Sequence, residues 1–187
     1  MKKIGITGSL ASGKTTACKI IPKNRGPIFS ADIVVQKLYK RNSFKKLISN
    51  SFKISNSRNM KEKLRKIILE DKRNLQVLEK IIHPLVRKEM RAFTKKNNNK
   101  KMVFYEIPLL IESKLMKNFD TLIFIKSKKN IRLKRFISKG GNKKIFKMLN
   151  GEQLKESKKA KFCDYVVVND KNIKFLKEKL LDIFKKL

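Results

Sequence analysis

The 187-residue sequence lacks tryptophan and has one histidine, two cysteines and few acidic residues. Two widely separated cysteines cannot build a disulfide framework, and a zinc site needs more cysteine and histidine than this chain offers. No apolar run approaches the length of about 18 residues that a membrane-spanning helix requires. The N-terminus also lacks the uninterrupted apolar segment of a signal peptide. We therefore expect a soluble, cytoplasmic protein with no membrane partner.

Acidic side chains number 15 against 49 lysines and arginines, which gives a net charge of +34. A strongly basic protein can bind nucleic acid by neutralising phosphates. Here, however, the basic residues are 40 lysines and 9 arginines spread along the whole chain, whereas nucleic-acid readers rely on arginine for bidentate contacts. We expect no specific nucleic-acid partner, although a basic nucleic-acid-binding protein remains a competing class. An anionic small-molecule substrate would suit this charge.

Short apolar segments alternate with stretches of helical periodicity, which predicts an α/β fold with a parallel sheet flanked by helices. The length predicts one domain. Residues 33–97 instead predict a succession of helices, in which His83-Pro84 breaks two of them. We therefore expect a core of about 1–32 and 101–187, with a helical insertion of about 33–100. The predicted strands lie at 2–7, 27–29, 102–105 (ending at Glu106), 120–125 and 165–168.

Residues 8–15 read GSLASGKT and match the phosphate-binding pattern GxxxxGK[ST] between a predicted strand and a predicted helix. Glycine lets the backbone approach phosphate, and successive N–H groups at a helix N-terminus attract anions. Lys14, expected to be an exposed loop side chain, would reach the β- and γ-phosphates, and the Thr15 hydroxyl would ligate Mg²⁺. The predicted nucleotide site comprises Gly8, Ser9, Leu10, Ala11, Ser12, Gly13, Lys14, Thr15 and Thr16.

The sequence lacks the guanine-reading motif of a Ras-like GTPase, so a small kinase is the favoured reaction class. Such an enzyme needs a carboxylate near the acceptor hydroxyl and cations that cover the phosphates. Asp32 follows the second predicted strand, at the sheet edge where ligands collect, and is either the catalytic base or the N-cap of the next helix. Arg132 and Arg135 lie one helical turn apart and suit a lid of about 132–160.

Two further residues have alternative roles. Glu106 ends a buried strand, where it would either order Mg²⁺ through water or cap a loop. His83, the only histidine, either contacts substrate or merely lies where one helix ends and the next begins.

Several segments together resemble dephospho-coenzyme A kinase. They are residues 8–16, Ala31-Asp32, residues 75–84 ending in His-Pro, residues 107–112 (IPLLIE), Arg135, Gln153 and residues 163–170 (CDYVVVND). The resemblance runs along the chain in the family's order. It implies a P-loop kinase fold with a helical substrate-binding insertion and a lid.

The resemblance also implies the reaction, in which the γ-phosphate of ATP passes to the ribose 3′-hydroxyl of dephospho-CoA. It implies catalytic roles for Asp32, Lys14 and Arg135, and contacts of Asp32, His83, Pro108 and Leu109 with the substrate. The alternative is another P-loop small-molecule kinase with a nucleoside or shikimate-like acceptor. We expect a monomer or a weak oligomer.

The chain departs from the family pattern at three positions. Ser30 stands where the family commonly has the first acid of Asp-Ala-Asp, and Lys61 and Lys139 replace arginines. Lysine keeps the charge but loses the bidentate fork of arginine. The sequence assigns no role to Glu112.

Overall fold

The computed structural model describes residues 1–55 and 59–187, which form two compact units. The first unit comprises residues 1–30 and 97–187, and the second comprises residues 31–96. The whole sheet belongs to the first unit, whereas the second unit is helical.

Five parallel strands form the sheet of the first unit in the order β2-β3-β1-β4-β5. Gly8 at the end of β1 lies opposite Ile125 in β4, and Ile6 lies opposite Glu106 at the end of β3. The carboxyl ends of these strands therefore meet at one edge of the sheet. The predicted α/β fold with a parallel sheet is confirmed. The strands are β1 (Lys2–Gly8), β2 (Ile28–Ser30), β3 (Met102–Glu106), β4 (Thr121–Lys126) and β5 (Tyr165–Val168).

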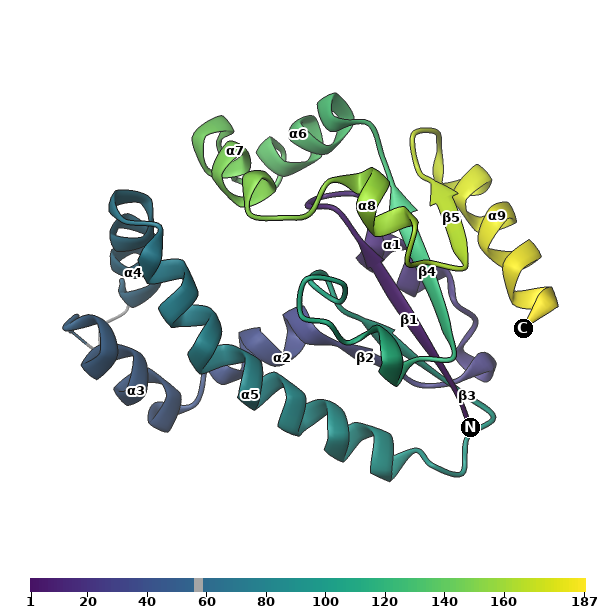
Figure 1. The fold of residues 1–187 in the computed structure, drawn as a ribbon, viewed down its shortest axis with the longest axis horizontal. Helices are drawn as coiled ribbons and strands as arrows, with labels where there is room; N and C mark the ends of the chain where they lie inside the picture. Colours follow the sequence, from purple (N-terminus) through teal and green to yellow (C-terminus); the bar gives the residue numbers. More distant parts are fainter. Residues whose placement is uncertain (56–58) are drawn as a thin grey trace. The chain divides into compact units, whose positions relative to one another are not determined.

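Helices α1 (Lys14–Ile20) and α9 (Ile173–Lys186) cover one face of this sheet, and α9 lies beside β5 (Figure 1). The short 3₁₀ helix η1 (Lys23–Arg25) follows α1. Apolar side chains at helical spacing on α9 pack against alternate residues of the strands, as an amphipathic helix on a parallel sheet requires. The buried cluster contains Ile4, Ile6, Ala17, Cys18, Ile21, Phe104, Ile123, Ile125, Val167, Leu176, Leu180, Ile183 and Phe184.

The other face of the sheet is packed by the loop that follows β3, which includes the 3₁₀ helix η2 (Met116–Asn118). A Cβ at Gly5 would lie 2.7 Å from Leu122 Cδ2 and 2.8 Å from Leu110 Cδ1. Glycine in β1 therefore admits these side chains, and Phe119 packs edge-on against Tyr105 with the ring centroids 5.2 Å apart. Helix α8 (Glu156–Ala160) lies against β4.

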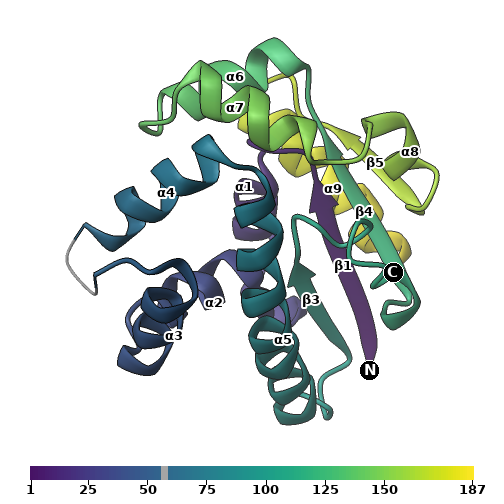
Figure 2. The same ribbon diagram turned by 60° about the vertical axis from the view of Figure 1, so that its left-hand side comes forward.

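Helices α6 (Lys129–Ile137) and α7 (Lys143–Gly151) follow β4 and lie beyond the carboxyl ends of β1 and β4 (Figure 2). Asp170 anchors the start of α6, because its Oδ1 accepts hydrogen bonds from Lys128 N at 2.8 Å and Ser127 Oγ at 2.9 Å. The side chain of Asn142 caps α7 by accepting a hydrogen bond from Ile145 N.

The second unit consists of α2 (Ala31–Leu38), α3 (Asn42–Phe52), α4 (Met60–Glu70) and α5 (Arg73–Lys96). The prediction that His83-Pro84 breaks two helices is wrong, because Pro84 lies inside the continuous α5. Proline removes one backbone hydrogen bond there, but α5 packs against both α2 and α4, and this packing keeps it helical. In the described part of the chain, no helix is both long and apolar enough to span a membrane.

Candidate functional site

The phosphate-binding loop joins β1 to α1 at the carboxyl edge of the sheet. Gly13 precedes α1 with a φ of 101°, in the left-handed region that glycine tolerates best. A Cβ at Gly13 would collide with Asn169 Nδ2, so a larger residue there would displace the Asn169 amide as well as strain the backbone. The Asn169 amide donates to Ser12 O at 2.8 Å and thereby ties the loop to the end of β5.

Lys14 lies inside this loop. Only 7% of its surface is exposed, so the expectation of an exposed side chain is wrong. Its ammonium donates to Gly8 O at 3.1 Å and Ser9 O at 3.0 Å, because the loop backbone curls around the side chain. An anionic phosphate oxygen is a stronger partner for ammonium than a neutral carbonyl. The positively charged ammonium of Lys14 therefore lies within the loop, where it would attract a phosphate group.

Thr15, on the first turn of α1, contacts Glu106 at the end of β3. The Thr15 hydroxyl donates to Glu106 Oε1 at 2.6 Å, and Glu106 is only 2% exposed. Hydroxyl and carboxylate oxygens are the hard ligands that Mg²⁺ prefers. In the residues that the structure describes, no group of three or more His, Cys, Asp or Glu could hold a metal ion. Thr15 and Glu106 suit a cation that is also held by phosphate oxygens, since Mg²⁺ in nucleotide sites takes few protein ligands.

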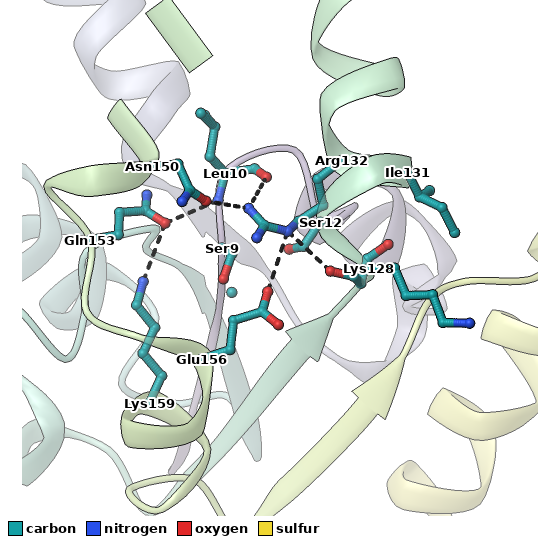
Figure 3. A network of polar contacts seen from close by, with 12 residues as sticks. Ser9, Leu10, Ser12, Lys128, Ile131, Arg132, Asn150, Gln153, Glu156 and Lys159 are labelled. Carbon is teal, nitrogen blue, oxygen red and sulfur yellow. Dashed lines mark hydrogen bonds and ion pairs between the residues drawn. The ribbon is translucent and has the colours of Figure 1, made fainter. Parts of the chain in front are cut away.

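Arg132 on α6 is 4% exposed and joins several segments around the loop (Figure 3). Its guanidinium donates to Leu10 O at 3.3 Å and Ser127 O at 3.0 Å. It also donates to Asn150 Oδ1 at 2.7 Å and lies 3.3 Å from Glu156 Oε1. Burial lowers the pKa of Arg132, and the Glu156 carboxylate opposes that shift. Arg132 thus connects α7 and α8 to the phosphate loop, a role that the sequence did not indicate.

Arg135 lies one turn further along α6 and faces the loop from the same side. It donates to Ser12 O at 3.4 Å, to Ser127 Oγ at 3.3 Å and to Asn169 O at 3.0 Å. The predicted lid arginine is therefore at the nucleotide loop in this structure. Sequence reasoning missed Asn169, although a polar residue directly after the last predicted strand was a signal for a side chain at this edge.

Pro108 and Leu109 follow β3 in the same unit and are partly buried. Thr7 Oγ1 donates to Pro108 O at 3.1 Å, which fixes this turn beside the end of β1. The remaining predicted site residues, Asp32 and His83, belong to the second unit.

Asp32 lies in the first turn of α2, which begins at Ala31, so the alternative of an N-cap is not what the structure has. A carboxylate in a first turn is favoured by the helix dipole. His83 is a partly buried residue of α5. Their catalytic and substrate-binding roles stay predictions.

The family model and the curated relatives that match this chain share one description. A family model described as dephospho-CoA kinase matches residues 2–174. A dephospho-CoA kinase of Bartonella henselae is 35% identical over 192 aligned residues, covering 100% of this chain and 98% of the relative. A solved structure from Thermus thermophilus superposes with a TM-score of 0.80 at 22% identity, covering 100% of this chain and 97% of the other. A dephospho-CoA kinase from Campylobacter jejuni superposes with a TM-score of 0.66 at 25% identity and the same coverage.

Proposed function

The chain belongs to the dephospho-CoA kinase family, and from this membership we propose that it transfers the γ-phosphate of ATP to the ribose 3′-hydroxyl of dephospho-CoA. The observation that carries the proposal is the family match over residues 2–174, which covers the whole second unit and most of the first. The products are coenzyme A and ADP. The P-loop kinase fold, with its phosphate loop at the carboxyl edge of a parallel sheet, supports this assignment.

The phosphate loop binds the nucleotide. Its backbone N–H groups at the start of α1 attract the phosphates, and Lys14 exchanges its carbonyl partners Gly8 O and Ser9 O for phosphate oxygens. As the bond from the γ-phosphorus to the bridging oxygen of ADP breaks, charge spreads over the transferring group. Lys14 and the Arg135 guanidinium stabilise that charge, and residues of about 132–160 act as the lid that excludes water.

The oxygens of Thr15 and Glu106 would hold Mg²⁺, and their chemistry and their contact at 2.6 Å support this. When bound, Mg²⁺ neutralises charge on the β- and γ-phosphates. Without the ion, Glu106 holds the Thr15 hydroxyl and thereby keeps the first turn of α1 against the end of β3.

The acceptor is handled by residues whose roles rest on the family resemblance. Asp32 orients the ribose 3′-hydroxyl and takes its proton as the new oxygen–phosphorus bond forms. His83, Pro108 and Leu109 contact dephospho-CoA, and the helical insertion of about 33–100 supplies much of the substrate-binding surface. Each of these assignments is open to substitution experiments.

The proposed setting is the cytoplasm, which supplies ATP and whose reducing conditions suit two free cysteines. Burial raises the pKa of the Cys163 thiol to about 12, with a further contribution from Asp164, so this group stays protonated there. We propose a monomer or weak oligomer, and light scattering over a range of concentrations tests this.

The test of function is a coupled assay of the purified protein with Mg-ATP and separate acceptors: dephospho-CoA, shikimate and a nucleoside. We expect ADP release only with dephospho-CoA, and coenzyme A as the product by mass spectrometry. The Lys14→Met variant, purified in the same way, is the control for contaminating kinases. Phosphorylation of shikimate or the nucleoside in place of dephospho-CoA would overturn the proposal.

A further inference from the structure

Glu112 lies in the loop after β3 and contacts a short segment at two points, one just before α8 and one within it. Its Oε1 accepts a hydrogen bond from Leu154 N at 3.1 Å and lies 2.6 Å from the ammonium of Lys159. Lys159 has no exposed surface, and the Glu112 side chain is 16% exposed. One carboxylate oxygen thus fixes the segment at residue 154 and again at residue 159.

Gln153 connects this segment to the phosphate loop (Figure 3). Its Oε1 accepts a hydrogen bond from Leu10 N at 3.0 Å and a longer one from Lys159 Nζ at 3.5 Å. A continuous set of contacts therefore runs from Glu112 through Lys159 and Gln153 to the backbone of Leu10. We call these four residues the Glu112 link.

The link acts on a residue whose backbone N–H and carbonyl are both held. Leu10 donates its N–H to Gln153, while its carbonyl accepts from Arg132 at 3.3 Å. The two contacts come from different residues of the segment that spans α6 to α8. Together they set the direction in which the chain enters Ala11, Ser12 and Gly13, the part of the loop that precedes α1.

Stability alone is a poor explanation for the buried pair of Glu112 and Lys159. Removing two charges from water offsets much of their attraction, and apolar replacements of such pairs are often neutral or stabilising. The second carboxylate oxygen, Glu112 Oε2, is also buried, and within the described residues it has no hydrogen-bond partner. That oxygen adds a desolvation cost. A role in placing this segment against the phosphate loop explains the buried pair of Glu112 and Lys159 better than a role in stability does.

We propose that Glu112 is a positioning residue, which through Lys159 and Gln153 holds the phosphate loop in the conformation that binds nucleotide. This inference rests on the proposed function, since it adds to the proposed nucleotide site a residue that raises nucleotide affinity by fixing the loop. Loop N–H groups bind phosphate best when their directions are fixed before the ligand arrives. Loss of the link therefore weakens nucleotide binding without touching the nucleotide.

The experiment measures ADP binding by calorimetry and the steady-state constants for both substrates. Glu112→Gln removes the charge that holds Lys159, and Glu112→Gln/Lys159→Met removes the contact between the two side chains. Both variants should bind ADP about three- to tenfold more weakly, the loss expected for one charge-assisted contact that fixes a loop. KM for ATP should rise by a similar factor, with KM for dephospho-CoA unchanged. The double variant leaves no unpaired buried charge, so its melting temperature should lie near that of the wild type.

Two variants of Gln153 separate positioning from folding. Gln153→Leu removes the acceptor for Leu10 N and should weaken ADP binding to the same extent, whereas Gln153→Glu keeps an acceptor oxygen and should bind ADP more tightly than Gln153→Leu. Asp164→Asn is the matched control, because Asp164 is another carboxylate that accepts a backbone hydrogen bond, from Leu122 N at 2.7 Å at the amino end of the sheet. It should leave ADP affinity unchanged.

Wild-type ADP affinity in the folded double variant, or in Gln153→Leu, would overturn the proposal. If Glu112→Gln alone does not fold, the double variant and the Gln153 pair still decide it. ADP binding is measured without the acceptor. A wild-type protein that binds ADP but does not phosphorylate dephospho-CoA would therefore overturn the proposed function and leave the role of Glu112 to be judged on its own.

Discussion

Thr15 and Glu106 are 91 residues apart in the chain, and their side-chain oxygens lie 2.6 Å apart. The contact joins the first turn of α1 to the end of β3, so two elements supply one pair of oxygens beside the phosphate loop. Because the sheet is parallel, β1 and β3 end at the same edge, and this topology makes the contact possible.

Replacement of Glu106 by glutamine tests whether this pair serves the metal. Glu106→Gln keeps the shape and an acceptor for Thr15 but removes the charge. We expect the Mg²⁺ concentration for half-maximal activity to rise about tenfold or more, because loss of one charged ligand weakens the binding of a hard cation. ADP binding without Mg²⁺ should be unchanged, and Thr15→Ser, which keeps the hydroxyl, is the control. An unaltered Mg²⁺ titration would mean that Glu106 only holds the loop.

Lys14 should be essential for turnover and nearly neutral for folding. Because the side chain is buried, Lys14→Met is preferable to alanine, since it keeps most of the buried volume. We expect kcat to fall by about 10²–10³, the loss typical when one group that stabilises transition-state charge is removed. Lys19→Met, an exposed lysine on the same helix, should change kcat little. Near-normal turnover of Lys14→Met at saturating ATP would contradict the kinase assignment.

Pro84→Ala should stabilise the protein. Pro84 lies inside α5, where it lacks an N–H for the helix ladder, and a proline there costs about 3 kcal/mol in an isolated helix. Packing has already absorbed part of that cost, so we expect the free energy of unfolding to rise by about 1 kcal/mol in urea denaturation. Lys88→Ala, an exposed substitution in the same helix, should change it by less than about 0.5 kcal/mol. A loss of stability in Pro84→Ala would show that the proline packs favourably.

Local sequence was enough to predict the sheet and the phosphate loop. Strands β3 and β4 are nearly continuous apolar runs because both of their faces are buried. Such a run predicts a strand even when the neighbouring strands are unknown. The phosphate loop was predictable because its residues act locally: the glycines allow the tight loop conformation, and Lys14 binds phosphate.

The rest depended on contacts between distant segments. Pro84 indicates a helix end locally, and only packing along α5 overrides that signal. The sequence predicts Arg132 only as a cation of the lid, and its contacts with Asn150 and Glu156 depend on the packing of later segments. The contact of Gln153 with Leu10 spans 143 residues, and no spacing or periodicity in the sequence indicates it.

Asp32 carries the last prediction. Phosphoryl transfer to a ribose hydroxyl requires that the hydroxyl be oriented toward the γ-phosphate and that its proton be accepted. Asp32→Asn keeps the size of the side chain and a polar oxygen in the first turn of α2, but removes the charge and the basic group. We expect a melting temperature and an ATP affinity near those of the wild type. Single-turnover transfer to dephospho-CoA should slow by about 10²–10⁴, the range for a lost general base.

The control for Asp32 is Asp71→Asn in the same unit. Asp71 is another carboxylate close to a helix start, where it accepts a hydrogen bond from Arg73 N at 2.9 Å. Hydrogen bonds from Arg73 lower the pKa of Asp71, so its charge matters to local structure but has no part in the proposed chemistry. Asp71→Asn should transfer phosphate at the wild-type rate. If Asp32→Asn does so as well, Asp32 only stabilises the first turn of α2, and Glu106 becomes the next candidate for the base.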